Sequence, residues 1–243
     1  MITTLSRGKG KAQMKLHTQE WGTGPRTAAL IHGIMSDHRT WHRVGPALAA
    51  KGYRVIAVYL RGHGTSPRGP YSAESWADDL TETLPHNLDL AIGHSLGGMA
   101  LALAVERLTP ARAVYADPAW ALHHGRNVDP AVYTDLKHAT RETLSIRNPD
   151  WTTTDLDIEL ATLADWDPDT THAVLGPNAL DRTPTHPIVP SLVLTADPSP
   201  LVSPALATRL KEQGFEVRPV TGTGHTIHRD NHDAFMKSLD DWI

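Results

Sequence analysis

A serine held between glycines is the residue of this chain best suited to act as a nucleophile. Residues 93–97 read Gly-His-Ser-Leu-Gly and follow the apolar run Leu90–Ile92. A serine hydroxyl is a weak nucleophile until a base takes its proton, and a sharp turn after a strand can lift it toward such a base. The small apolar residues Met99–Val105 are typical of a helix, whose N-terminal amides would point toward a negative oxygen at Ser95. The pattern therefore predicts a strand, a turn that carries Ser95, and a helix.

Two later loops can supply a base and an acid. Asp197 follows the apolar run 190–195, and His225 lies in a glycine-bounded loop after the run 215–220. The carboxyl ends of parallel strands meet at one edge of a sheet, so these side chains are expected to converge on Ser95. An imidazole can take the serine proton, and a carboxylate can hold the imidazole in the required tautomer.

A glycine turn near the N-terminus is expected at the same edge. The apolar run 27–31 ends in His32-Gly33-Ile34-Met35. Gly33 lets the backbone turn so that the amide of Ile34 can face the cavity beside Ser95 and donate to an oxyanion. The alternative is an ordinary turn at the end of a strand.

These loops need a scaffold, and the alternation of apolar runs with amphipathic segments predicts one. An α/β fold with a mostly parallel, doubly wound sheet and right-handed crossovers follows from this order. Besides the strand before Ser95, strands are expected at residues 14–21 (an antiparallel edge), 27–31, 54–60, 111–116, 190–195 and 215–220. Besides the helix after Ser95, helices are expected at residues 36–50, 74–84 with Ser72 as cap, 205–213 and 230–243.

A long segment without strand patterns interrupts this alternation. Helical patterns near 130–145, 155–164 and 168–175 predict a helical cap at residues 119–186, inserted into a core of residues 1–118 and 187–243. Such a cap would lie over the mouth of the active site. Its aromatic residues are expected either to line an apolar substrate pocket or to pack the cap onto the core; they are Trp120, Tyr133, Trp151 and Trp166.

Composition excludes several classes of function. The 243 residues carry a net charge of −4 with no basic stripe, which speaks against nucleic acid and membrane surfaces as partners. No apolar run approaches the roughly 18 residues of a membrane span, and the N-terminus lacks the apolar core of a signal peptide, so a cytoplasmic protein is expected.

The residue types also give no support for a metal or a cofactor. The absence of cysteine excludes disulfides, a thiol nucleophile and thiolate metal ligands. The fifteen histidines show no H-E-x-x-H or H-x-H-x-D-H pattern, so neither a metal nor another cofactor is expected.

Four motifs together resemble the α/β-hydrolase superfamily. They are His32-Gly33, the sequence Arg-Gly-His-Gly-Thr-Ser at 61–66, Gly-His-Ser-Leu-Gly at 93–97, and Gly224-His225. The chain is most similar to the capped branch of esterases, lactonases, cofactor-free haloperoxidase-like enzymes and C–C bond hydrolases, over residues of about 15–118 and 187–243.

This resemblance implies a role for each candidate residue. Ser95 would be the nucleophile, His225 the general base and then acid, and Asp197 the orienting acid, while the amides of Ile34 and Leu96 would form the oxyanion hole. Epoxide hydrolases and haloalkane dehalogenases that resemble this family carry aspartate at the nucleophile position, so the serine argues against both.

The chain departs from the family pattern at one position and leaves a choice at another. Relatives usually carry Asp two residues before the Arg of the R-G-H-G motif, where this chain has Tyr59, so a structural hydrogen bond is expected to be remade. Asp117 also ends an apolar run, at a site where some relatives place their acid. The context Leu-Thr-Ala-Asp favours Asp197.

The remaining histidines near these motifs are expected to support loops. His32 and His94 would pack or bond to loop backbone, and His63 would brace its own loop. His228 is expected at a solvated helix start, with assistance to His225 as the alternative.

The function expected is hydrolysis of a small, apolar carboxylic ester or lactone through an acyl-enzyme on Ser95. The alternatives are a C–C bond or thioester hydrolase with the same triad, and a ligand-binding protein of this fold with little turnover. The sequence does not indicate an oligomeric state.

Overall fold

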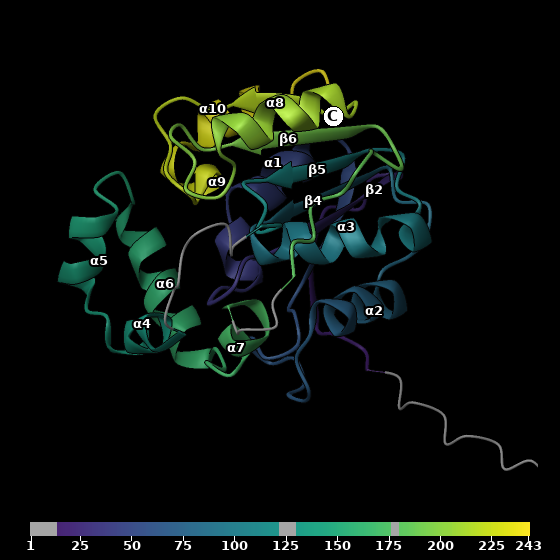
Figure 1. Ribbon diagram of the computed structural model, residues 1–243. Coiled ribbons are helices and arrows are strands. Elements are labelled where there is room, and N and C mark those ends of the chain that lie inside the picture. The colour runs from purple at the N-terminus through teal and green to yellow at the C-terminus, as the bar shows by residue number, and fades with distance from the viewer. Residues whose placement is uncertain (1–13, 122–129, 176–179) are drawn as a thin grey trace, which may run out of the picture.

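A seven-stranded sheet forms the centre of the computed structural model, which describes residues 14–121, 130–175 and 180–243 (Figure 1). The strands are β1 (Thr18–Trp21), β2 (Arg26–Ile31), β3 (Tyr53–Val58), β4 (Leu90–His94), β5 (Ala113–Ala116), β6 (Ser191–Thr195) and β7 (Glu216–Pro219). Their order is β1-β3-β2-β4-β5-β6-β7, and each neighbouring pair is parallel except β1 with β3. The predicted α/β fold with an antiparallel edge strand is confirmed.

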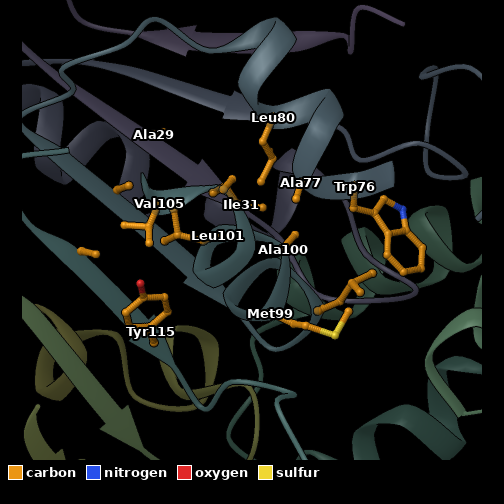
Figure 2. Packing of buried hydrophobic residues seen from close by; sticks show 14 of the residues in the cluster. Ala29, Ile31, Trp76, Ala77, Leu80, Met99, Ala100, Leu101, Val105 and Tyr115 are labelled. Atoms are coloured by element: carbon orange, nitrogen blue, oxygen red, sulfur yellow. The ribbon is translucent and has the colours of Figure 1, made fainter. Parts of the chain in front are cut away.

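Helices cover both faces of the sheet. They are α1 (Val44–Ala50), α2 (Ala73–Thr83), α3 (Leu96–Leu108), α8 (Pro204–Glu212), α9 (Ile227–Asp230) and α10 (His232–Lys237). The side chains of β2 alternate between the two covered faces. Ala29 and Ile31 pack with α2 and α3, as Figure 2 shows, whereas Ala28 and Leu30 pack with α1 and α10. A strand segment covered on both faces is apolar on both, which is why residues 28–31 of β2 form a continuous apolar run.

Local side-chain chemistry explains where several helices begin. The Ser72 hydroxyl accepts a hydrogen bond from the Ser75 amide at 3.0 Å, and the Ser75 hydroxyl accepts one from the Ser72 amide at 2.9 Å. This reciprocal capping box fixes the start of α2, as the sequence predicts. The predicted helix 36–50 is instead divided into a short 3₁₀ turn, η1 (His38–Trp41), and α1. Pro46 is tolerated only in the first turn of a helix, so α1 begins near Val44.

The predicted C-terminal helix 230–243 is shorter in the structure, where α10 covers His232–Lys237. Asn231 separates α9 from α10, and its side chain accepts a hydrogen bond from the Ala234 amide at 3.0 Å. This N-cap starts a new helix that ends at Lys237, well before Ile243.

A group of helices connects β5 to β6 and lies to one side of the sheet (Figure 1). Leu144, Trp151, Leu156, Leu163 and Trp166 form a small core of their own there. Residues 1–13 of the predicted core and 122–129 and 176–179 of the predicted cap lie outside the described residues. The elements of this group are α4 (Pro130–Thr134), the 3₁₀ turn η2 (Asp135–His138), α5 (Arg141–Arg147), α6 (Thr153–Asp165) and α7 (Thr170–Leu175).

Helix α3 approaches the sheet closely because it begins with glycines. A Cβ atom placed on Gly97 would lie 2.6 Å from the carbonyl oxygen of His32 and nearer still to that of Ile31. A side chain there would push α3 away from β2, and Ser95 would move with the helix.

We therefore expect Gly97→Ala to destabilise the protein by about 1–3 kcal/mol, because the added methyl overpacks a contact between two backbones. Urea unfolding measures this change. Gly69→Ala is the matched control, since a Cβ atom there meets its nearest neighbour at an ordinary 3.5 Å. Equal stability of the two variants would contradict the close approach of α3.

Candidate active site

Ser95 occupies a strained turn between β4 and α3. Its φ of 51° and ψ of −115° lie in a region that residues with side chains rarely adopt. The Ser95 amide donates to the Ala116 carbonyl at 3.0 Å, and the Ser95 carbonyl accepts from the Met99 and Ala119 amides at 3.1 and 3.0 Å. These bonds hold the strained backbone in place. The predicted order of strand, turn and helix is observed around Ser95.

His225 joins Ser95 to a carboxylate. Its Nε2 atom lies 3.0 Å from Ser95 Oγ, and its Nδ1 atom lies 2.6 Å from Asp117 Oδ2. The loop after β7 therefore places one imidazole between a hydroxyl and a buried carboxylate. With Nδ1–H donating to Asp117, Nε2 is the acceptor that faces the serine hydroxyl.

The predicted acid, Asp197, does not contact His225, and the partner is Asp117 instead. In the β5–β6 register Ala116 pairs with Leu194, so Asp117 lies opposite Thr195, directly after the end of β5. Asp197 follows Thr195 by two residues and lies further from the end of the sheet. Asp197 is exposed, whereas Asp117 is fully buried with a φ of 41°.

The loop after β6 supports the acid rather than supplying it. The Ala196 amide and the Ser199 hydroxyl both donate to Asp117 Oδ1. These bonds leave Oδ2 to receive the imidazole N–H of His225.

Buried histidines brace the neighbouring loops, as predicted. His94 Nε2 donates to the His225 carbonyl at 2.9 Å, and His32 Nδ1 donates to the Gly33 carbonyl at 2.7 Å. His32 Nε2 accepts from the Leu60 amide at 2.9 Å, and His63 Nδ1 donates to the Arg61 carbonyl at 3.0 Å.

Burial lowers the pKa of His94 and of His63 well below the ordinary value and lowers the pKa of His32 to about 4. All three rings are therefore neutral at pH 7.

Two further expectations concern Tyr59 and His228. The Tyr59 carbonyl accepts a hydrogen bond from the Ser66 hydroxyl at 2.6 Å, and the Tyr59 hydroxyl lies 3.4 Å from His38 Nε2. These contacts occur at the position where relatives usually carry aspartate. The expectation of a solvated His228 is wrong. Its side chain is 2% exposed and stacks on Trp41 with 4.1 Å between the ring centroids.

A cavity of about 340 Å³ opens beside Ser95 and His225. Ile34 and Leu96, whose amides are the predicted oxyanion donors, both line it, and that role stays a prediction. Part of the apolar lining comes from residues that the sequence did not single out, namely Val174, Leu175 and Leu201. Apolar residues in a pocket and in a core look alike in sequence.

Only one of the four predicted aromatic residues lines this cavity. Tyr133 does so, and Trp151 lines a neighbouring hollow. The pocket interpretation is wrong for Trp120, which is buried with its Nε1 donating to the Gly98 carbonyl at 3.2 Å. It is also wrong for Trp166, which is buried among the inserted helices with its Nε1 donating to Thr170 Oγ1 at 2.7 Å.

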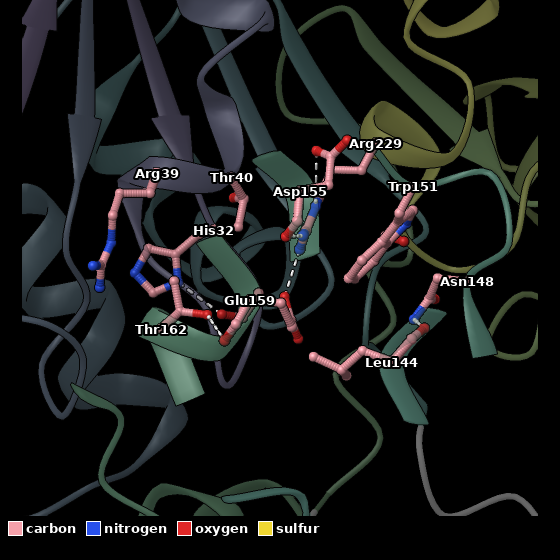
Figure 3. Close-up of polar contacts among 12 residues, drawn as sticks. His32, Arg39, Thr40, Leu144, Asn148, Trp151, Asp155, Glu159, Thr162 and Arg229 are labelled. Carbon is pink, nitrogen blue, oxygen red and sulfur yellow. Dashed lines mark hydrogen bonds and ion pairs between the residues drawn. The ribbon is translucent and has the colours of Figure 1, made fainter. Parts of the chain in front are cut away.

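A charged cluster that sequence reasoning missed lies next to the cavity. Arg229 is 2% exposed and donates to Glu159 Oε2 at 2.5 Å and to the Asp155 carbonyl, while its guanidinium carbon lies 3.6 Å from the ring centroid of Trp151 (Figure 3). Burial alone would raise the pKa of Asp155, but hydrogen bonds from Thr152 and the charge of Arg229 hold it below its ordinary value. This cluster connects α6 to α9, the short helix that follows His225.

In the part of the chain that the structure describes, no three histidine, aspartate or glutamate side chains are grouped to hold a metal ion. None of the described helices has the length and apolar character needed to cross a membrane.

A mostly parallel sheet with a serine at the turn after a central strand and a histidine after the last strand defines an α/β hydrolase. The chain belongs to the alpha/beta hydrolase family, whose model matches residues 29–237. The resemblance inferred from the four motifs is thereby confirmed.

Individual relatives match shorter stretches. Bifunctional epoxide hydrolase 2 of Sus scrofa is 37% identical over 97 residues, which cover 37% of this chain and 17% of that protein. Lipase LipV of Mycobacterium tuberculosis is 36% identical over 118 residues, which cover 46% of this chain and 44% of the lipase. The chain thus spans less than half the length of these curated relatives.

A solved structure matches nearly the whole chain. The N-formylmaleamic acid deformylase of Pseudomonas putida S16 superposes with a TM-score of 0.78 over 93% of this chain and 96% of its own, at 22% sequence identity. Similarity at this level shows the shared fold.

The neutral His32 makes the stability of the fold depend on pH. Its pKa is about 4 in the folded protein against 6.5 in the unfolded chain, so between these values the unfolded chain binds the additional proton. We expect His32 to cost up to about 3 kcal/mol of stability as the pH falls from 6.5 toward 4, and none above 6.5. Urea unfolding at several pH values checks this.

His32→Asn keeps a donor and an acceptor without titrating, so its stability should fall less steeply with acid. Exposed His86→Gln is the control and should keep the wild-type slope. Identical slopes for His32→Asn and the wild type would contradict the assignment.

Proposed function

We propose that this protein hydrolyses small carboxylic esters or lactones through an acyl-enzyme on Ser95. One observation carries the proposal: a single imidazole lies 3.0 Å from the serine Oγ and 2.6 Å from a buried carboxylate. This is the arrangement that activates a serine hydroxyl for attack on a carbonyl carbon.

The steps follow from the positions of these groups. His225 Nε2 takes the proton of Ser95 as Oγ bonds to the carbonyl carbon, and the amides of Ile34 and Leu96 stabilise the oxyanion. The imidazolium then gives that proton to the leaving oxygen as the acyl–oxygen bond breaks. Water attacks the acyl-enzyme by the same route and restores Ser95. Asp117 holds Nδ1–H of His225 throughout and stabilises the imidazolium.

The size and lining of the cavity favour a small apolar acyl group. A volume of about 340 Å³ is near the lower end for small-molecule sites. Its aliphatic lining includes Ile34 and Met35 from one loop and Val174 and Leu175 from α7. In this proposal the inserted helices act as a cap, since α6 and α7 supply part of the wall.

The relatives support ester chemistry more than epoxide opening. LipV is named a lipase, and the family resemblance implies that epoxide hydrolases carry aspartate where this chain has Ser95. A serine forms an acyl ester that water can hydrolyse, which fits a carboxylic ester or lactone.

The nucleophile can be identified directly. A fluorophosphonate should label the wild type at Ser95, as peptide mass spectrometry will show, and Ser95→Ala should lose both the label and the turnover of p-nitrophenyl esters by a factor of about 10⁶. Thioesters and C–C substrates assayed in parallel separate the other reactions open to this triad. Full esterase activity in Ser95→Ala would exclude the acyl-enzyme, and an unlabelled wild type without turnover would favour a binding protein.

The acid can be tested by a matched pair of substitutions. Asp117→Asn should lower kcat by about 10⁴, because an amide cannot stabilise the imidazolium or hold the same tautomer of His225. Asp197→Asn, at an exposed side chain beyond the same rim, should leave kcat unchanged. Steady-state kinetics on one ester suffices, and the reverse ranking of the two variants would restore Asp197 as the acid.

A further inference from the structure

The loop that carries Ile34, residues 32–37, has a strained backbone of its own. Met35 has a φ of 63°, in the left-handed region that favours glycine. Such a conformation persists only where surrounding contacts fix it. The position of the Ile34 amide, the proposed oxyanion donor, therefore depends on what holds this loop.

The inserted helices supply part of these contacts. The Ile34 side chain packs against the core beside α2 and α3 and also against the small core of the insertion. Met35 packs against the insertion core as well. The residue whose amide would meet the oxyanion thus lies between the sheet and the insertion.

An ion pair joins the far end of the same loop to α6. Arg39, on η1, donates from Nε to both carboxylate oxygens of Asp37 at 3.0 Å, and from Nη2 to Asp37 Oδ2 at 2.6 Å. The same Nη2 donates to Asp165 Oδ2 at 2.7 Å. Burial alone would raise the pKa of Asp37, but the hydrogen bonds from Arg39 hold it below its ordinary value. Arg39 therefore connects a buried, ionised carboxylate of the loop to the last residue of α6.

Helix α6 is fixed to the core without the help of Arg39. At its C-terminal end the Asp165 carbonyl accepts from Arg68 Nη2 at 2.5 Å. Just before its N-terminal end, Trp151 Nε1 donates to Asp230 Oδ1 at 2.7 Å. The helix has 13 residues and is therefore about 20 Å long. It forms a fixed support with η1 near one end and α9 near the other.

We propose that α6 sets the position of the oxyanion donor, and that Arg39 and Asp165 are positioning residues that act through the amide of Ile34. The inference rests on the proposed ester hydrolysis. An oxyanion hole stabilises the transition state only while its donors stay at hydrogen-bond distance from the developing negative oxygen. Neither Arg39 nor Asp165 lines the cavity at Ser95, so the ion pair acts on the reaction without touching the substrate.

Two aspartates of α6 give a matched pair of variants. The side chains of Asp165 and Asp157 are 52% and 57% exposed, and the carboxylate of each pairs with an arginine. The partner of Asp157 is Arg141 of α5, within the insertion. Asp165→Ala removes the bond to Arg39 and keeps the carbonyl that accepts from Arg68, so α6 stays in place while the loop is released.

The variants are assayed on p-nitrophenyl butanoate and on its thiono analogue, in which sulfur replaces the carbonyl oxygen. Sulfur is larger and a weaker acceptor, so an oxyanion hole spaced for oxygen favours the oxo ester. Asp165→Ala should lower kcat/KM about tenfold for the oxo ester and much less for the thiono ester. Asp165→Glu should restore both values, and Asp157→Ala should keep both at the wild-type level. Thermal unfolding checks that all three variants are folded.

A second measurement needs no folded alanine variant. Arg39 and Asp165 are partly exposed, with 30% and 52% of their side chains accessible, so salt screens their attraction. Added salt should therefore lower the ratio of kcat/KM for the oxo ester to that for the thiono ester in the wild type. In Asp165→Ala the ratio should not depend on salt.

Two results would overturn the assignment while leaving the proposed function intact. One is an Asp165→Ala variant with wild-type kcat/KM for the oxo ester. The other is an equal loss for the oxo and thiono esters, which would show that the ion pair has a structural role only. If no ester is hydrolysed and fluorophosphonate does not label Ser95, the proposed function itself fails and the positioning role fails with it.

Discussion

The strained backbone of Ser95 is the constraint on which the site depends. A positive φ at a residue with a side chain costs about 1–3 kcal/mol, and it persists only where the surroundings hold it. Close packing holds it here. Helix α3 lies against β2 through Gly97, and the Gly33 backbone comes so near that a Cβ atom on Gly33 would meet the side chains of His94 and Ser95 at 2.9 and 3.2 Å. The apolar core on both faces of the sheet supplies the free energy that keeps these segments together. The backbone conformation of Ser95 therefore depends on the packing of the whole sheet.

Much of the site could be predicted because strand ends determine where side chains meet. The glycines around Ser95 and the glycine loop before His225 are local signals, and a parallel sheet brings them to one rim. The acid could not be predicted in this way, since Asp117 and Asp197 both follow buried strands. What separates them is the register of β5 against β6, a tertiary fact that sets Asp197 beyond the rim. Local sequence context favoured the wrong residue because it carries no information on that register.

The walls of the site were harder to predict than its reactive groups. Tryptophan is large and apolar, so it can pack in a core or line a pocket. Trp120 and Trp166 pack in cores. Val174 and Leu175 line the cavity because α7 turns one face toward Ser95, and the direction of that face depends on how the inserted helices pack. Helix boundaries in this segment could be predicted more closely than its orientation, since capping boxes such as Thr152 with Asp155 are local.

The short helix α9, which follows His225, links the base to the inserted helices. Asp230 accepts hydrogen bonds from the Gly224 amide, from the Thr226 hydroxyl and from Trp151 Nε1, at 2.8, 2.7 and 2.7 Å, so one carboxylate holds both sides of the His225 loop and a residue of the insertion. Arg229 adds its bond to Glu159 and its contact with Trp151. Burying a guanidinium is costly, and a buried ion pair adds little stability compared with apolar residues of the same volume. The consequence of these bonds is therefore positional: the residue that moves the proton and the residues that shape the substrate cavity are held in one hydrogen-bonded unit.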